Sequence, residues 1–142
     1  MKNLREENGR KIARILKKIG PESARLRTRS EWDLRIYYSS REDNKLTIEM
    51  SSTSEYLGEL FMDPLMKIEL KLDDEGQIVE AVPLYYLSKT FFVTDELYSE
   101  GNPECWNPKL YDKEGVMDFR LSAWLRNIRI QRYLSDGKIE KL

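Results

Sequence analysis

Strict alternation of hydrophobic and polar residues is the feature of this sequence that most limits its fold. The segment 66–72, MKIELKL, alternates without a break, and similar alternation occurs in 32–38 and 46–50. Because successive side chains of a strand point to opposite faces, the pattern predicts strands with one buried and one exposed face. Polar turns at 41–44 and 73–76 join these segments to neighbouring runs, which predicts two hairpins.

The second hairpin closes with the run QIVEAVPLYYL, residues 77–87, which contains Pro83. Proline has no backbone N–H and cannot donate to the ladder, so we expect this strand to be at an edge or bulged at Pro83. The segment 51–64 before the hairpin contains Gly58 and the Asp63–Pro64 step. We interpret that step as the point where a loop leads into a strand.

Residues 1–20 are predicted to form an N-terminal helix. Asn3 and Glu6 have the spacing of a capping box, and the isoleucines and leucine that follow recur at helical intervals. Gly20 and Pro21 together form a stop signal, because glycine suits a helix C-cap and proline prevents continuation.

The region 107–134 is predicted to hold the C-terminal helix, with its main part at about 116–134. Hydrophobic residues on two faces of this segment indicate that it is largely covered. The preceding connector 22–30 shows little periodicity, and we expect the tail after 134 to be frayed.

These elements predict one α+β domain over residues 1–142. We expect the N-terminal helix, a mostly antiparallel sheet of four to five strands within 31–98, and a C-terminal helix packed on that sheet. A chain of 142 residues is long enough to bury a core without disulfides.

Histidine is absent and Cys105 is the only cysteine, which narrows the chemistry available to the chain. Hydrolysis by the usual Ser–His–Asp or Cys–His arrangements requires an imidazole, and zinc sites require histidine or several thiolates. We therefore expect no cofactor, no metal and no enzymatic activity, and we interpret Cys105 as inert packing. One alternative keeps Glu55, Glu59 and Asp63 as carboxylates that align on a helix for acid–base work or Mg²⁺.

Neither a secretory signal nor a membrane span is recognisable in the sequence. The N-terminal segment MKNLREENGRK is charged, and no run approaches the roughly 20 apolar residues that a spanning helix needs. With a single cysteine, a reducing compartment is the natural expectation. We expect a cytoplasmic protein without membrane contact.

An acidic loop with aromatic residues is the predicted partner-binding site. Exposed aromatic side chains beside carboxylates suit protein recognition, because they supply contact area at low entropic cost. The alternative is a loop that Trp106 pins to the core. The residues of the predicted site are Asp95, Glu96, Tyr98, Glu100, Glu104 and Trp106.

Charge is segregated along the chain although the net charge is only −1. Residues 1–41 carry +7, residues 42–118 carry −12 and residues 119–142 carry +4. Such asymmetry is typical of nucleic-acid binders, but it also fits basic helices that pair with an acidic sheet in the same molecule. For nucleic-acid binding the candidate residues are Lys11, Arg14, Lys18, Arg126, Arg129 and Arg132.

Residues 55–134 resemble a family of small uncharacterised α+β domains encoded on bacterial mobile elements and phages. The matching pieces are Gly58–Glu59–Leu60, MDPLMKIEL (62–70), AVPLYY (81–86), ELY (96–98) and WLRNIRIQRYL (124–134). The resemblance implies a mobile-element context, and the family supplies no catalytic residues to transfer.

The function that these observations predict is non-enzymatic binding of a host protein. A phage or plasmid accessory protein that inhibits a host-defence nuclease would fit, because carboxylates of the −12 segment can mimic phosphate. Nucleic-acid binding through the basic helices is the alternative. The sequence leaves the oligomeric state open.

Overall fold

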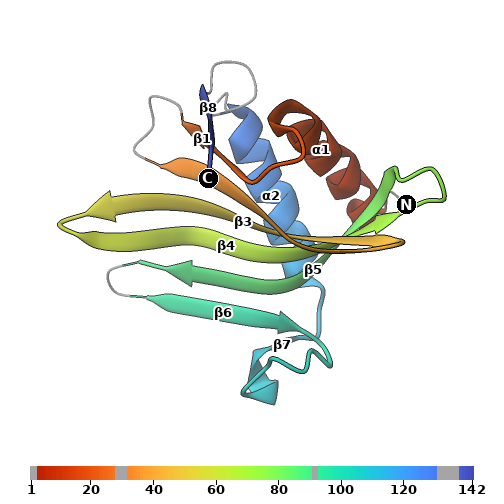
Figure 1. The fold of residues 1–142 in the computed structure, drawn as a ribbon. Helices are drawn as coiled ribbons and strands as arrows, with labels where there is room; N and C mark the ends of the chain where they lie inside the picture. Colours follow the sequence, from red (N-terminus) through yellow and green to blue (C-terminus); the bar gives the residue numbers. More distant parts are fainter. Residues whose placement is uncertain (1–2, 28–31, 91–92, 131–137) are drawn as a thin grey trace.

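A computed structural model of the chain describes residues 3–27, 32–90, 93–130 and 138–142 (Figure 1). These residues form two α-helices, one short 3-10 helix and eight strands. In chain order the elements are α1 (Leu4–Ile19), β1 (Ala24–Arg27), β2 (Asp33–Glu42), β3 (Lys45–Tyr56), β4 (Glu59–Leu72), β5 (Ile78–Lys89), β6 (Thr94–Ser99), η1 (Pro108–Leu110), β7 (Tyr111–Asp112), α2 (Val116–Ile130) and β8 (Lys138–Lys141).

The eight described strands form one mixed sheet in the order β7-β6-β5-β4-β3-β2-β1-β8. Neighbouring strands are antiparallel except β6 and β7, which pair in parallel with Tyr98 opposite Tyr111. The class is α+β, but the prediction of four to five mostly antiparallel strands is wrong, because the sheet is larger and mixed.

Two of the additional strands lie where the sequence predicted a connector and a frayed tail. β1 and β8 have four residues each, and they pair with one another antiparallel, with Arg25 opposite Glu140. A four-residue strand carries too little alternation to be recognised alone, and the partner of β1 lies more than 100 residues away in sequence. The sheet thus extends beyond the predicted region 31–98 at both ends of the chain.

The β3–β4 hairpin is longer than the sequence indicated. β3 continues to Tyr56, and Leu57 and Gly58 form a two-residue turn with φ values of 52° and 80°. Positive φ at both central residues is the geometry that suits the twist of tight hairpins. The Asp63–Pro64 step therefore lies inside β4, so the predicted loop before it is wrong.

The predicted bulge at Pro83 is present, in a strand that has neighbours on both sides. Between the pairs Lys67–Tyr85 and Ile68–Pro83 the register of β4 and β5 shifts by one residue, which leaves Leu84 without a partner on β4. The bulge changes which face of β5 the following side chains occupy.

Both helices cover the same face of the sheet (Figure 1). The other face has no helix among the described residues, and we call it the helix-free face. None of the described helices is long and apolar enough to cross a membrane. The core between helices and sheet consists of Ile12, Ile15, Leu16, Leu26, Leu34, Ile36, Ile48, Met50, Met66, Ile68, Leu70, Ala81, Met117, Leu121, Trp124, Leu125 and Ile128.

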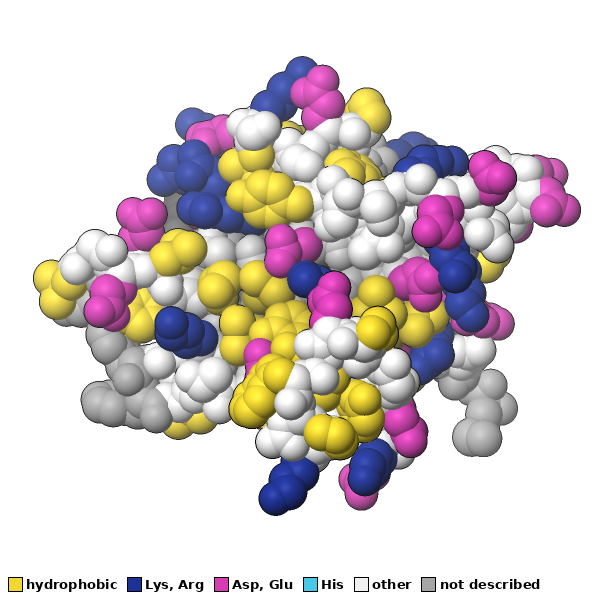
Figure 2. Space-filling view, turned by 60° about the horizontal axis from the view of Figure 1, so that its bottom comes forward, with side chains coloured by type: hydrophobic (Ala, Val, Ile, Leu, Met, Phe, Trp, Pro, Cys, Tyr) yellow, Lys and Arg dark blue, Asp and Glu magenta, His cyan; other side chains and the backbone are white. Residues whose placement is uncertain are grey.

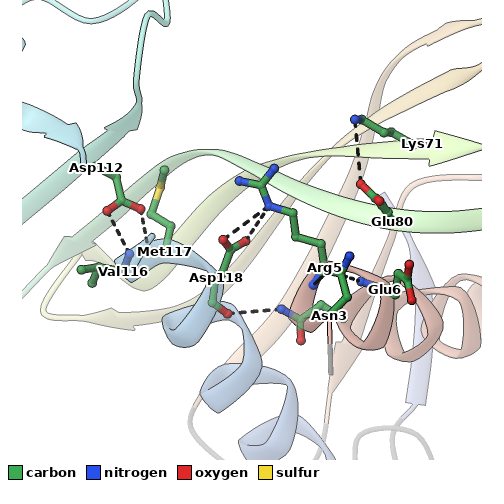
Figure 3. A network of polar contacts seen from close by, with 10 residues as sticks. Asn3, Arg5, Glu6, Lys71, Glu80, Asp112, Val116, Met117 and Asp118 are labelled. Carbon is green, nitrogen blue, oxygen red and sulfur yellow. Dashed lines mark hydrogen bonds and ion pairs between the residues drawn. The ribbon is translucent and has the colours of Figure 1, made fainter. Parts of the chain in front are cut away.

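The two helices begin next to one another, and polar contacts fix both starts (Figure 3). The carboxylate of Asp112 accepts hydrogen bonds from the backbone N–H groups of Val116 and Met117 at 2.9 and 2.8 Å. Asp118 in the same turn forms an ion pair with Arg5 of α1 at 3.2 Å. These contacts satisfy N–H groups that a helix start leaves unpaired.

At Gly9 α1 makes its closest approach to the sheet. Gly9 is buried, and a Cβ atom at this position would lie 3.2 Å from the backbone of Glu80 in β5. This contact brings the apolar face of α1, with Ile12 and Leu16, against the sheet. Glycine inside a helix costs roughly 1 kcal/mol relative to alanine, and here the close packing offsets that cost.

Replacing Gly9 by leucine should lower the free energy of unfolding by about 1–3 kcal/mol, because the added side chain has to displace the backbone of β5. Chemical denaturation followed by circular dichroism measures this change. The matched control is Arg10→Leu, an exposed neighbour on the same helix, which should change stability by less than about 0.5 kcal/mol. Equal stability of the two variants would show that α1 does not lie on β5 as described.

Candidate binding surface

Three side chains from neighbouring strands form a row on the helix-free face. Lys67 of β4 lies opposite Tyr85 of β5, which lies opposite Tyr98 of β6. Directly opposite residues share a face of the sheet, and the neighbours of Lys67 on β4 belong to the core on the other face. The two tyrosine rings are 4.7 Å apart and tilted, and the Lys67 ammonium lies 5.8 Å from the Tyr85 ring centre.

The loop after β6 folds back over this row. The side-chain amide of Asn102 donates to the backbone carbonyl of Leu84 at 3.0 Å, which fastens the loop to β5. Glu104 then forms an ion pair with Lys67 at 3.4 Å. Carbonyls at strand bulges are available to such side chains, because the ladder does not use them.

Trp106 is fixed by its polar edge while its ring stays in solvent. Its indole N–H donates to one oxygen of Glu96 at 2.8 Å, and the hydroxyl of Tyr85 donates to the other. Trp106 is 71% exposed, so the alternative in which it pins the loop to the core is wrong. We call the group of Lys67, Tyr85, Glu96, Tyr98, Glu104 and Trp106 the Trp106 surface.

Protonation keeps the hydrogen bonds of this surface in place. Burial raises the pKa of Tyr85, and its hydrogen bond to Glu96 raises it further. Burial likewise raises the pKa of Tyr98, with a further contribution from the charge of Glu96. Both phenols therefore stay neutral throughout the ordinary pH range, and Tyr85 remains a donor to the carboxylate.

Figure 2 turns the molecule so that the bottom of Figure 1, where β6 and β7 lie, comes forward. Hydrophobic side chains gather in the middle of this view, and Lys and Arg side chains group at its upper left. An apolar centre bordered by charges is the usual composition of a protein contact surface.

Four of the six residues predicted for partner binding belong to the Trp106 surface. Asp95 does not, because it follows the opposite face of β6 and forms an ion pair with Arg120 of α2 at 2.7 Å. Glu100 lines a separate hollow of about 350 Å³ near the starts of the helices, with Arg5 and Asp112. The four that come together are Glu96, Tyr98, Glu104 and Trp106.

Lys67 and Tyr85 belong to the surface although the sequence did not single them out. They lie on the β4–β5 hairpin, outside the acidic loop. The alternation of the predicted hairpin could have placed both on its exposed face, but only the register of β5 against β6 brings them to Trp106.

A second charged group on the sheet consists of three arginines and two carboxylates near β1. Arg25 pairs with Glu140 of β8, which holds the pKa of the Glu140 carboxyl below its usual range. Asp33 lies 3.5–4.0 Å from guanidinium nitrogens of Arg25, Arg27 and Arg35. These charges neutralise one another, so the group has little charge left for a partner.

The predicted nucleic-acid residues are only partly described. Lys11, Arg14 and Lys18 lie on α1, and none of them forms an ion pair within the described part of the chain. Arg126 is exposed on α2. Arg132 and the side chain of Arg129 lie outside the described residues.

The three carboxylates of the metal or acid–base alternative do not form a helical row. Glu55 ends β3 and Glu59 begins β4, where Glu55 is opposite Leu60 and Glu59 opposite Tyr56, so the two point to different faces. Asp63 accepts a hydrogen bond from Ser88 at 2.6 Å. Within the described residues no three acidic or thiol side chains come together in a way that could hold a metal ion.

Cys105 lies between the two parts of the loop that carry Glu104 and Trp106. Its thiol donates to the backbone carbonyl of Asn107, with sulfur and oxygen 3.1 Å apart. A base that could activate the thiol does not contact it among the described residues, which agrees with a packing role.

Comparison with protein-family models, with curated proteins and with solved structures finds no match for this chain. The resemblance of residues 55–134 to mobile-element domains therefore stays a prediction. What the chain binds has to be argued from its own geometry.

Removing the carboxylate of Glu96 should release the Trp106 indole. Hydrogen bonds to charged groups contribute about 1.5–3 kcal/mol, so Glu96→Ala should speed hydrogen exchange of the Trp106 indole N–H by about tenfold or more. Indole signals in ¹⁵N-resolved NMR spectra measure this rate. Glu100→Ala is the matched control and should leave it unchanged. An unchanged rate in Glu96→Ala would contradict the described geometry.

Proposed function

We propose that this chain is a non-enzymatic protein-binding domain and that the Trp106 surface is its contact site. The observation that supports this most directly is the state of Trp106, which is 71% exposed and yet held by a hydrogen bond to Glu96. A large apolar ring in solvent is costly for a free molecule, and a ring already held in one orientation loses little entropy on binding.

The surroundings of Trp106 support the same proposal. Glu104 and Lys67 border the ring with opposite charges, and the Tyr85–Tyr98 pair beside them supplies further rigid apolar area. Tryptophan and tyrosine are the residues that most often dominate the binding energy of protein interfaces. Charged residues at the border add selectivity and orientation.

The geometry supports a protein partner more than a particular one. Inhibition of a host-defence nuclease through phosphate-like carboxylates requires carboxylates that are free to contact the partner. Glu96 is engaged by Trp106 and Tyr85, and Glu104 by Lys67, so this surface favours aromatic packing over phosphate mimicry. A host protein of a bacterium remains the partner class that we propose, following the sequence resemblance.

Trp106→Ala should weaken binding of the partner by about 30-fold or more, since central aromatic contacts contribute about 2 kcal/mol or more. The partner is captured from bacterial lysate on the immobilised chain, purified and titrated against each variant. Thermal unfolding should stay within about 0.5 kcal/mol of the unsubstituted chain, because the ring packs little.

The control for this experiment is Phe119→Ala, which removes an aromatic ring that is 65% exposed on α2. It should leave binding unchanged, because α2 lies on the opposite face of the sheet. Loss of binding in Phe119→Ala with retention in Trp106→Ala would contradict the proposal, and so would failure to capture any partner.

Nucleic-acid binding is a second candidate, and one observation favours it. Five basic residues of α1 form no ion pair within the described part of the chain, so the helix does not pair its charge with the acidic sheet. A row of unpaired cations on one helix suits contacts with phosphates. The five are Arg10, Lys11, Arg14, Lys17 and Lys18.

If α1 binds nucleic acid, affinity for a fluorescent duplex should fall steeply with salt. Each phosphate contact contributes a slope of about 0.9 to the decline of log K with log salt. The variant Lys11→Gln, Arg14→Gln and Lys18→Gln should flatten that slope by about two to three. The control Lys45→Gln with Lys71→Gln removes paired lysines and should leave the slope unchanged. Anisotropy that does not change at low salt would eliminate this candidate.

A further inference from the structure

A groove of about 950 Å³ lies between the C-terminal end of α1 and the ends of two hairpins. One wall is formed by residues 13–21, which include the last turns of α1 and the Gly–Pro step after it. The other walls come from residues 38–46 of the β2–β3 hairpin and 72–78 of the β4–β5 hairpin. The groove lies away from the Trp106 surface, on the helix side of the sheet.

The floor of the groove is apolar. It is an open end of the core, where α1 and the hairpins diverge and hydrophobic side chains line the space. The hydroxyl of Tyr38 donates to the backbone carbonyl of Gly20 at 2.7 Å, so the polar end of this ring is satisfied and its apolar part faces the groove. The apolar residues that line it include Leu16, Leu46, Leu72 and Ile78.

The rim of the groove is basic, and a bulge contributes to this. Arg14 and Lys17 reach it from α1. In β2 the register shifts between Tyr38 and Ser40, and the shift places Arg41 directly opposite Leu46, whose side chain is on the helix side. Without the bulge a serine would occupy this face and Arg41 would point away. Bulges commonly re-aim a side chain in this way.

The charge of the rim is not compensated within the molecule. Among the described residues that line the groove there is no Asp or Glu. Arg14, Lys17 and Arg41 form no ion pair in the part of the chain that the structure describes. The arginine group near β1 is different, because Asp33 and Glu140 already neutralise it. Three cations around an apolar floor therefore leave room for an anion with an apolar tail.

We propose that this groove binds an amphiphilic carboxylate, a molecule with one unbranched acyl chain and an anionic head. The acyl chain lies along the apolar floor and removes it from water, and the carboxylate lies among the cations of the rim. A volume of about 950 Å³ is within the usual range of small-molecule sites. The sites of protein binding and of acyl binding are separate, so each can fail without the other.

Titration calorimetry with decanoate, below its micelle concentration, tests the proposal on the full chain. Decanoate should bind at least about tenfold more tightly than butyrate, which lacks most of the tail. It should also bind at least about tenfold more tightly than 1-decanol, which lacks the charge, and than inorganic phosphate, which lacks the tail. Phosphate that binds as tightly as decanoate would overturn the proposal, because the apolar floor would then contribute nothing.

The variant Lys17→Gln with Arg41→Gln should weaken decanoate binding about tenfold and leave decanol binding unchanged. Both side chains are exposed, so the variant should fold normally, which circular dichroism checks. The matched control is Lys11→Gln with Lys18→Gln, which removes two charges from the same helix outside the groove and should leave decanoate binding intact. Equal weakening by both variants, or absence of decanoate binding in the unsubstituted chain, would overturn the proposal.

Discussion

The close contact of α1 with β5 at Gly9 is the interaction on which this structure most depends. Two helices of about fifteen residues cover one face of an eight-stranded sheet, and they can do so only if they lie directly on it. The missing side chain at Gly9 permits the approach, and Ile12, Ile15 and Leu16 then reach the inner row of the strands. Because strand side chains alternate, the burial of one face leaves every second residue on the helix-free face.

That division of the sheet explains where the candidate sites lie. The helix-free face has no layer over it among the described residues, so its side chains either pair across strands or contact solvent. At the end formed by β4, β5 and β6 the loop around Trp106 folds over the face and holds an aromatic ring outward. At the covered face the helices diverge from the hairpin ends, and the basic groove opens there. Both sites follow from how far two short helices can extend over a wide sheet.

Strong local patterns in the sequence predicted the central hairpins, the N-terminal cap at Asn3 and the bulge at Pro83. β1 and β8 could not be predicted, because their pairing across the length of the chain has no local signal. The same limit applied to the site. Asp95 and Glu96 are adjacent in sequence and were grouped together, but neighbouring residues on a strand point to opposite faces, so only Glu96 reaches Trp106. Tyr85 joins them through a register that only the folded sheet shows.

The central claim is that the helix-free face around Trp106 is where this protein meets its partner. Hydroxyl-radical footprinting of the chain, alone and saturated with its captured partner, tests this claim most directly. Our account predicts that the partner protects Trp106 and Tyr85 from oxidation and leaves Phe119 on α2 as reactive as before. Protection of Phe119 with unchanged oxidation of Trp106 would contradict it and assign binding to the helical side.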